Sequence, residues 1–241
     1  MTSKLTEVST PPQAAMPKPT LANKQLPHKV FIIGLPRTGT TSVSVALLEQ
    51  GLTVAHQAFT KQAFMLADVV SDAPCFSDYQ QLDVLFPKAK FVYLDRPLDK
   101  WLPSMQMLLS KMLVHLDKHN GRFHPLMKRS FNHCFDIWQV EDALDEAHLT
   151  ACYQRHQQQV LGYFAGRDDF ISIDISVDGS LAKLLQFIDL AGPDTAELPQ
   201  LNFPQLNMGR NVASWDEYKH PNKISANASG PDKRKFFDYR L

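Results

Sequence analysis

The sequence has few cysteines and no long apolar run. Only three cysteines occur among its 241 residues. A count that is low and odd argues against a disulfide framework and suits a reducing compartment, so it predicts a cytoplasmic protein. No stretch reaches the roughly 18 consecutive apolar residues of a membrane span. Residues 1–28 also lack the apolar core of a secretory signal. The sequence therefore predicts neither a membrane span nor secretion.

An excess of charge of one sign is also lacking. Lys+Arg and Asp+Glu number 25 each, so the formal net charge is zero at pH 7. A protein that coats nucleic acid would be broadly basic. We therefore expect no nucleic-acid partner, although the balance is compatible with a local basic pocket. The 44% of hydrophobic and 21% of charged residues are ordinary for a globular protein. A chain of this length buries roughly 70–75% of its unfolded surface, so it needs no disulfide or metal to fold.

The distribution of proline and polar residues predicts one domain between two arms. Five prolines lie within residues 1–28, among scattered lysine, glutamate, serine and threonine. This composition predicts a disordered or loosely docked arm. From about residue 211 the chain turns polar again. We therefore expect a single domain over residues 29–210, followed by a polar C-terminal tail over residues 211–241.

Strand-like and helix-like segments alternate within the domain. Short apolar runs that predict buried strands occupy residues 29–34, 52–56, 91–94 and 170–175. Apolar residues at helical spacing predict helices over residues 43–48, 58–71, 81–86, 101–116, 142–165 and 181–188. Alternation of this kind indicates βαβ units. The sequence thus predicts an α/β fold of three layers, α/β/α, with a mostly parallel central sheet of about four or five strands, of the P-loop nucleotide-binding type.

A glycine-rich loop joins the first predicted strand to the first predicted helix. It reads Gly34-Leu-Pro-Arg-Thr-Gly-Thr-Thr41. Successive N–H groups of such a loop, together with the helix N-terminus, form a cradle for phosphate-like anions. The spacing matches the nucleotide-hydrolase loop except at Thr40, where that loop has the lysine that reaches the β- and γ-phosphates. Arg37 supplies a cation from inside the loop instead. The missing lysine argues against ordinary ATP or GTP hydrolysis.

Two motifs in this order resemble those of sulfotransferases that use 3′-phosphoadenosine-5′-phosphosulfate (PAPS). Pro36-Arg-Thr-Gly-Thr-Thr-Ser42 resembles their 5′-phosphosulfate loop. Their second motif is an arginine at the end of a later strand and a serine eight residues on, which hold the 3′-phosphate. Arg96 and Ser104 match it, and a guanidinium with a hydroxyl suits a phosphate. The resemblance covers roughly residues 29–210 and is to the bacterial and uncharacterised branch of the superfamily.

A third segment, Phe203-Pro-Gln-Leu-Asn207 with Gly209-Arg210, resembles one that closes over the nucleotide in that branch. It lacks the longer Arg-Lys-Gly pattern of the cytosolic aryl sulfotransferases. The donor-binding residues that the resemblance implies are Arg37, Thr38, Gly39, Thr40, Thr41, Ser42, Arg96, Ser104 and Arg210.

The resemblance implies transfer of a sulfuryl group from PAPS to a hydroxyl or amine of a small-molecule or carbohydrate acceptor, without a metal. Two alternatives from other classes stay open. One is a P-loop nucleotide kinase or hydrolase, against which Thr40 argues. The other is a nucleotide-binding protein of the same fold without turnover. Neither the acceptor nor the oligomeric state follows from the sequence.

Three residues are candidates for the chemistry. Arg37 would stabilise charge on the departing 5′-phosphate. His56 ends the second predicted strand, and carboxyl ends of strands face the ligand crevice in open α/β sheets. Its ordinary pKa suits a general base. Asp78, in the loop expected before residues 81–86, is a second candidate, either as the base or as a group that orients His56 or Lys61. The structural alternatives are a histidine with satisfied hydrogen bonds and a loop-capping aspartate.

Overall fold

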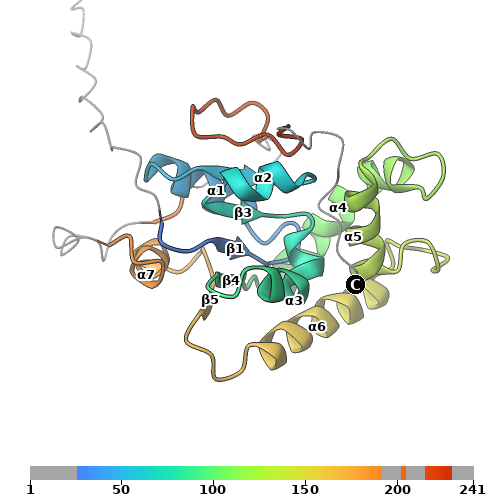
Figure 1. Ribbon diagram of the computed structural model, residues 1–241. Helices are drawn as coiled ribbons and strands as arrows, with labels where there is room; N and C mark the ends of the chain where they lie inside the picture. Colours follow the sequence, from blue (N-terminus) through green and yellow to red (C-terminus); the bar gives the residue numbers. More distant parts are fainter. Residues whose placement is uncertain (1–25, 192–201, 205–214, 230–241) are drawn as a thin grey trace, which may run out of the picture.

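The central sheet has the predicted parallel topology. A computed structural model describes residues 26–191, 202–204 and 215–229, so most of the predicted N-terminal arm lies outside the described residues. Within them, five parallel strands follow the order β2-β3-β1-β4-β5 (Figure 1). These strands are β1 (Val30–Ile32), β2 (Val54–His56), β3 (Val69–Ser71), β4 (Lys90–Leu94) and β5 (Phe170–Ile173). The expected α/β fold with a parallel sheet is confirmed.

Helices cover both faces of this sheet. In the described ranges they are α1 (Thr40–Glu49), α2 (Lys61–Leu66), α3 (Cys75–Leu85), α4 (Leu98–Leu116), α5 (Pro125–Phe135), α6 (Glu146–Tyr163) and α7 (Ser180–Phe187). Val30 and Ile32 of β1 pack with α1 and α7 on one face. Phe31, between them, packs with α2, α3 and α6 on the other, because successive strand residues point to opposite faces. None of these helices is both long and apolar enough to cross a membrane.

The predicted helix over residues 58–71 is wrong in its second half. The helix ends at Leu66, and Val69–Ser71 form β3, an inner strand that pairs with β1 and β2. A short apolar run fits a buried strand as well as a helix, so periodicity alone does not separate the two. The consequence for the site is direct. Asp72, which follows β3, lies at the carboxyl end of a strand next to β1.

The strand register aligns three loops. Ile32 of β1 pairs with Ser71 of β3, and Ser71 pairs with His56 of β2. The three strands therefore end in one row across the sheet, and the segment that follows each strand begins there. The phosphate loop, Asp72 and His56 consequently arise side by side, as expected at the carboxyl edge of an open α/β sheet.

Other boundaries differ from the predictions. The helix expected over residues 81–86 begins at Cys75, so Asp78 lies within the span of α3, at a kink where its own φ of −114° and ψ of 20° are not helical. Helix α4 begins at Leu98, before the expected start at residue 101, so Pro103 lies beyond its first turn. Helix α5, which was not predicted, contributes Met127 and Phe131 to an apolar cluster with α4 and α6. The helix expected over residues 142–165 is confirmed as the slightly shorter α6.

Part of the region expected to be a polar tail packs along the sheet edge. Lys223 forms a parallel bridge with Val54 of β2, and Ile224 N donates to Val54 O at 2.9 Å. The side chains of Trp215 and Tyr218 pack against the core that α1 covers. Residues 215–229, drawn in red, run beside α1 and α2 in Figure 1.

Candidate functional site

A cavity of about 800 Å³ opens at the carboxyl edge of the sheet. Loops that follow β1, β3, β4 and β5 all contribute to its wall, which is the usual ligand position in folds of this type. The sequence-predicted residues that line it are Arg37, Thr38, Gly39, Thr40, Thr41, Ser42, His56, Arg96 and Ser104. The structure thus brings together all but two of the predicted site residues. Arg210 lies outside the described residues, and Asp78 does not line the cavity.

The phosphate loop offers backbone donors to this cavity. Helix α1 begins at Thr40 without a side-chain cap, so its first N–H groups have no acceptor within the helix. Gly39 precedes it with a φ of 109°, in the left-handed region. A Cβ atom at Gly39 would lie 2.2 Å from Ile175 Cδ1, so only glycine fits both the backbone and the space. The loop therefore has the form of an anion cradle.

Two half-buried arginines lie beside the cradle. Arg37 Nε donates to Ser104 Oγ at 2.8 Å, and Arg96 Nη1 donates to the Arg37 carbonyl at 2.5 Å. Burial and the nearby Arg96 charge lower the pKa of Arg37. Burial also lowers the pKa of Arg96, against the opposite effect of Asp174. Neither guanidinium forms an ion pair with a side chain in the described part of the chain. An anionic ligand would relieve their mutual repulsion.

Hydrogen bonds from buried side chains of α4 and α6 hold the backbone at Pro36 and Arg96 in place. The indole Nε1 of Trp101, a fully buried residue of α4, donates to the Pro36 carbonyl at 2.9 Å. Tyr153 of α6 donates its hydroxyl to the Arg96 carbonyl at 2.6 Å. These contacts fix the backbone at Pro36 to α4 and the backbone at Arg96 to α6, and both arginines line the cavity.

His56 belongs to a hydrogen-bonded cluster. Its Nδ1 lies 2.8 Å from Ser71 Oγ and 3.2 Å from Ser44 Oγ. Its Nε2 lies 3.3 Å from Asp72 Oδ2. Burial lowers the pKa of His56, although the charge of Asp72 acts in the opposite direction. Burial therefore favours the neutral imidazole.

Asp72 also lines the cavity, and sequence reasoning missed it. The cause was the helix assigned over residues 58–71, which concealed the strand that ends at Ser71. The available signal was the run Val69-Val-Ser71, followed by Asp and then by Pro74. A β-branched apolar run that ends in turn-forming residues is typical of a buried strand.

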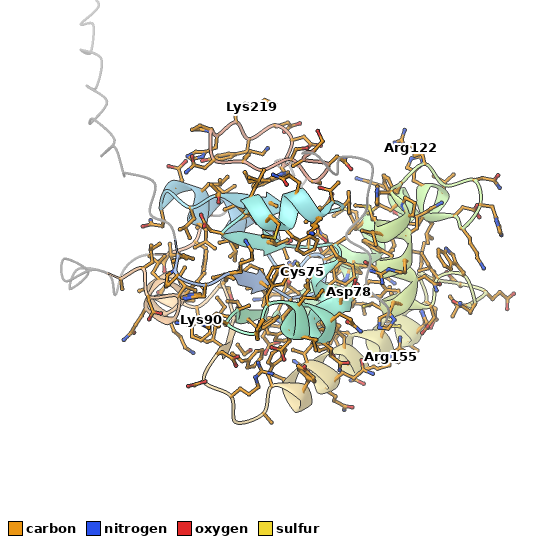
Figure 2. The ribbon with its side chains drawn as sticks, in the orientation of Figure 1. Cys75, Asp78, Lys90, Arg122, Arg155 and Lys219 are labelled. Atoms are coloured by element: carbon orange, nitrogen blue, oxygen red, sulfur yellow. The ribbon has the colours of Figure 1, made fainter. Side chains whose placement is uncertain are left out.

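Asp78 has a different environment from the one predicted. Its side chain is fully buried in α3 and forms an ion pair with Arg129 of α5. It also accepts a hydrogen bond from Ser77 Oγ at 2.6 Å. Figure 2 labels Asp78 near α3. The prediction that Asp78 is the base or orients His56 is therefore corrected: Asp72 contacts His56, and Asp78 holds α3 to α5.

A second cavity, of about 840 Å³, also has His56 in its wall. Its wall includes Phe59 and several residues of the segment 215–229. The Trp215 ring lies 5.1 Å from the His56 ring, measured between centroids. Lys219, labelled in Figure 2, lines the same cavity. His56 is thus at the boundary between two hollows of similar size.

Comparison with known proteins gives one finding. A family model described as "Sulfotransferase domain" matches residues 53–212, more than half of the chain. The match begins after the phosphate loop and includes His56, Asp72, Arg96 and Ser104. A search of curated proteins finds no matching relative. Among the described residues, no three histidine, cysteine, aspartate or glutamate side chains are grouped as metal ligands.

Proposed function

The chain belongs to the sulfotransferase domain family, and from this premise we propose that it transfers a sulfuryl group from PAPS to a hydroxyl or amine. The observation that carries the proposal is the pair Arg37 and Arg96. Both cations are half-buried in one cavity, beside the open N-terminus of α1, and neither forms an ion pair in the described part. A ligand with two separate anionic groups suits this arrangement.

The residues fit a nucleotide with phosphates at both ends of its ribose. The loop N–H groups and Arg37 would hold the 5′-phosphosulfate, as anions are held at helix N-termini. Arg96 and Ser104 would hold the 3′-phosphate with a guanidinium and a hydroxyl. Thr40, in place of a lysine, leaves the loop without the usual clamp for a γ-phosphate. These features favour PAPS over ATP or GTP.

The proposed chemistry is displacement at sulfur. The acceptor oxygen or nitrogen forms a bond to sulfur while the bond between sulfur and the bridging oxygen of the 5′-phosphate breaks. Charge then grows on that bridging oxygen, where Arg37 and the loop N–H groups would stabilise it. The His56–Asp72 pair takes the acceptor's proton. As in phosphoryl transfer, most of the work is positioning and electrostatic stabilisation.

The acceptor would lie against helix α4. Pro103, Met107 and Leu108 give the cavity an apolar wall there. Two other methionines of α4 do not line the cavity: Met105 is fully buried in the core, and Met112 packs against the cluster that joins α4 and α5. We therefore propose that a small-molecule or carbohydrate acceptor binds against this wall.

Calorimetric titration tests the donor. We expect 3′-phosphoadenosine-5′-phosphate, the product left after transfer, to bind tightly without Mg²⁺. ATP and GTP should bind weakly, with or without Mg²⁺, because the loop lacks a lysine for the γ-phosphate. Binding only of ATP or GTP with Mg²⁺ would show a nucleotide kinase or hydrolase instead. Turnover of PAPS in an acceptor screen then separates an enzyme from a binding protein without turnover.

Replacement of Arg96 should weaken nucleotide binding selectively. Loss of a charge-assisted contact costs about 1.5–3 kcal/mol, so Arg96→Ala should reduce affinity for the bisphosphate by about 10- to 150-fold. It should also abolish the preference for the bisphosphate over adenosine-5′-phosphate, which lacks the 3′-phosphate. Arg155→Ala is the control, since Arg155 is exposed and outside the cavity. Retained selectivity in Arg96→Ala would show that the 3′-phosphate binds elsewhere.

A further inference from the structure

We propose that Asp72 is the general base of the transfer and that His56 is a positioning residue which orients Asp72. The proposal rests on the proposed function, because it concerns the proton that the acceptor loses during sulfuryl transfer. It replaces the sequence-based prediction in which His56 itself is the base.

Both ring nitrogens of His56 have partners, which leaves neither for the acceptor. Ser44 Oγ lies 2.8 Å from Ser71 Oγ, and Ser71 Oγ lies 2.8 Å from His56 Nδ1. Asp72 as a carboxylate can only accept, so Nδ1 accepts a hydrogen bond from a serine hydroxyl, that of Ser71 or Ser44. The neutral imidazole then carries its proton on Nε2 and donates it to Asp72 Oδ2, 3.3 Å away. The lowered pKa of the buried His56 favours this neutral form.

Asp72 retains acceptor capacity. Its Oδ1 is buried and has no hydrogen-bond partner among the described residues. A buried acceptor atom without a donor costs roughly 1–3 kcal/mol, so such an atom in a native protein calls for an explanation. Asp72 also lines the cavity that contains the phosphate loop. The hydroxyl or amine of a bound acceptor would supply the missing donor.

The strand order places Asp72 between the loop and His56. β3 lies between β1 and β2, so the residue after β3 lies nearer to the phosphate loop than the end of β2 does. Asp72 has a φ of 58°, in the left-handed region that aspartate and asparagine tolerate better than most side chains. This conformation turns the chain sharply at the strand end, where Cys75 N donates to Asp72 O at 2.6 Å.

The proton balance of the step is simple. The acceptor's O–H or N–H bond breaks as its oxygen or nitrogen bonds to sulfur, and the proton moves to the Asp72 carboxylate. The electron pair of the cleaved S–O bond stays on the bridging oxygen, which leaves with the 5′-phosphate. His56 keeps its own proton throughout, and its hydrogen bond fixes the carboxylate.

The first test replaces the base. Release of the bisphosphate from PAPS is measured with water and with a panel of a phenol, a hexosamine and a primary amine. Asp72→Asn should slow release by about 10²- to 10⁴-fold, the usual contribution of a general base. Affinity for the bisphosphate should change little. Asp189→Asn is the matched control, because Asp189 has the same φ of 58° and lies outside the cavity. Wild-type rates in a folded Asp72→Asn variant would overturn the proposal.

The second test separates orientation from base catalysis at His56. Gln keeps a donor near the position of Nε2, so His56→Gln should retain release within about tenfold of wild type, the equivalent of one weakened hydrogen bond. His56→Leu has no donor and should lose about 100-fold through misplacement of the carboxylate. If His56 is the base, Gln and Leu will be equally inactive while Asp72→Asn keeps more activity, which overturns the proposal.

A third outcome concerns the proposed function alone. If the wild-type protein neither binds the bisphosphate nor releases it from PAPS under any of these conditions, the sulfotransferase reaction itself is wrong. Nitrogen-15 NMR of the His56 imidazole still tests the arrangement in that case. The contact is supported if Nε2 carries the proton in the wild type and the chemical shift of Nε2 changes when Asp72 is replaced by Asn. A proton on Nδ1 in the wild type overturns it.

Discussion

Arg37→Ala is expected to lower kcat for sulfuryl transfer by about 10²- to 10³-fold, while affinity for the bisphosphate falls much less. Removal of a single donor aimed at developing charge has effects of this size. In PAPS the bridging oxygen shares its electrons with sulfur, and it gains charge only as the bond to sulfur breaks. A donor at that position therefore stabilises the transition state more than the bound nucleotide, which places the loss in kcat.

The arrangement of the two arginines explains why binding should survive. Arg37 and Arg96 are close enough that the charge of Arg96 lowers the pKa of Arg37. Loss of Arg37 removes this repulsion, and Arg96 remains available to a phosphate. The two variants should therefore separate: Arg96→Ala mainly weakens binding, whereas Arg37→Ala mainly slows transfer. Alanine at position 37 meets the same left-handed φ of 72° as arginine does, so backbone strain is similar in the two proteins.

Steady-state kinetics with PAPS, together with calorimetry of the bisphosphate, distinguish these outcomes. Arg155→Ala again serves as the control for loss of an arginine outside the cavity. Equal losses in kcat and in bisphosphate affinity for Arg37→Ala would contradict the division of labour between Arg37 and Arg96. Such a result would indicate that Arg37 holds the nucleotide as strongly in the ground state as in the transition state.

The parts of the site that sequence could predict are those encoded by local spacing. The loop from Gly34 to Thr41 is a single contiguous segment, and its glycine positions follow from backbone geometry. Arg96 and Ser104 are eight residues apart, at the end of one strand and in the following helix. Such spacings can be recognised in the sequence without knowledge of the rest of the fold. The cavity lining contains these residues together.

Asp72 could not be predicted in this way, because its position depends on the assignment of three residues. Val69–Ser71 are apolar or small, and so are several residues of α2 before them. Only pairing with β1 and β2 decides that they form a strand. That pairing depends on residues that are distant in the sequence, so local periodicity does not reveal it. Once β3 is recognised, Asp72 stands at the carboxyl edge by topology alone.

Asp78 is a second residue whose role could not be predicted from the local sequence. Its partner, Arg129, is 51 residues away on α5, a helix that the apolar pattern did not reveal. A carboxylate in a chain of unknown fold resembles a candidate catalytic acid until its burial and its partner are known. The complete burial of Asp78 and the contact with Arg129 assign it a structural role, and this role has a measurable consequence.

Arg129→Met is expected to reduce the free energy of unfolding by about 3–5 kcal/mol, because it removes the Arg129 cation from its ion pair with the fully buried Asp78 carboxylate. For a domain of this size that corresponds to a decrease in Tm of about 6–20 °C. Methionine retains much of the apolar stem of arginine, so the loss reflects mainly the charge. Thermal and chemical unfolding followed by circular dichroism measure it.

Two further variants make this result specific to a buried pair. Asp78→Asn combined with Arg129→Met should recover part of the loss, since neither buried charge remains. Asp189→Asn removes the ion pair with Lys90, in which Asp189 is 64% exposed, and should cost no more than about 1 kcal/mol. If Arg129→Met costs no more than Asp189→Asn, the pair does not hold α3 to α5. If the double variant is less stable than Arg129→Met, the cost comes from packing around α5 and not from loss of the ion pair.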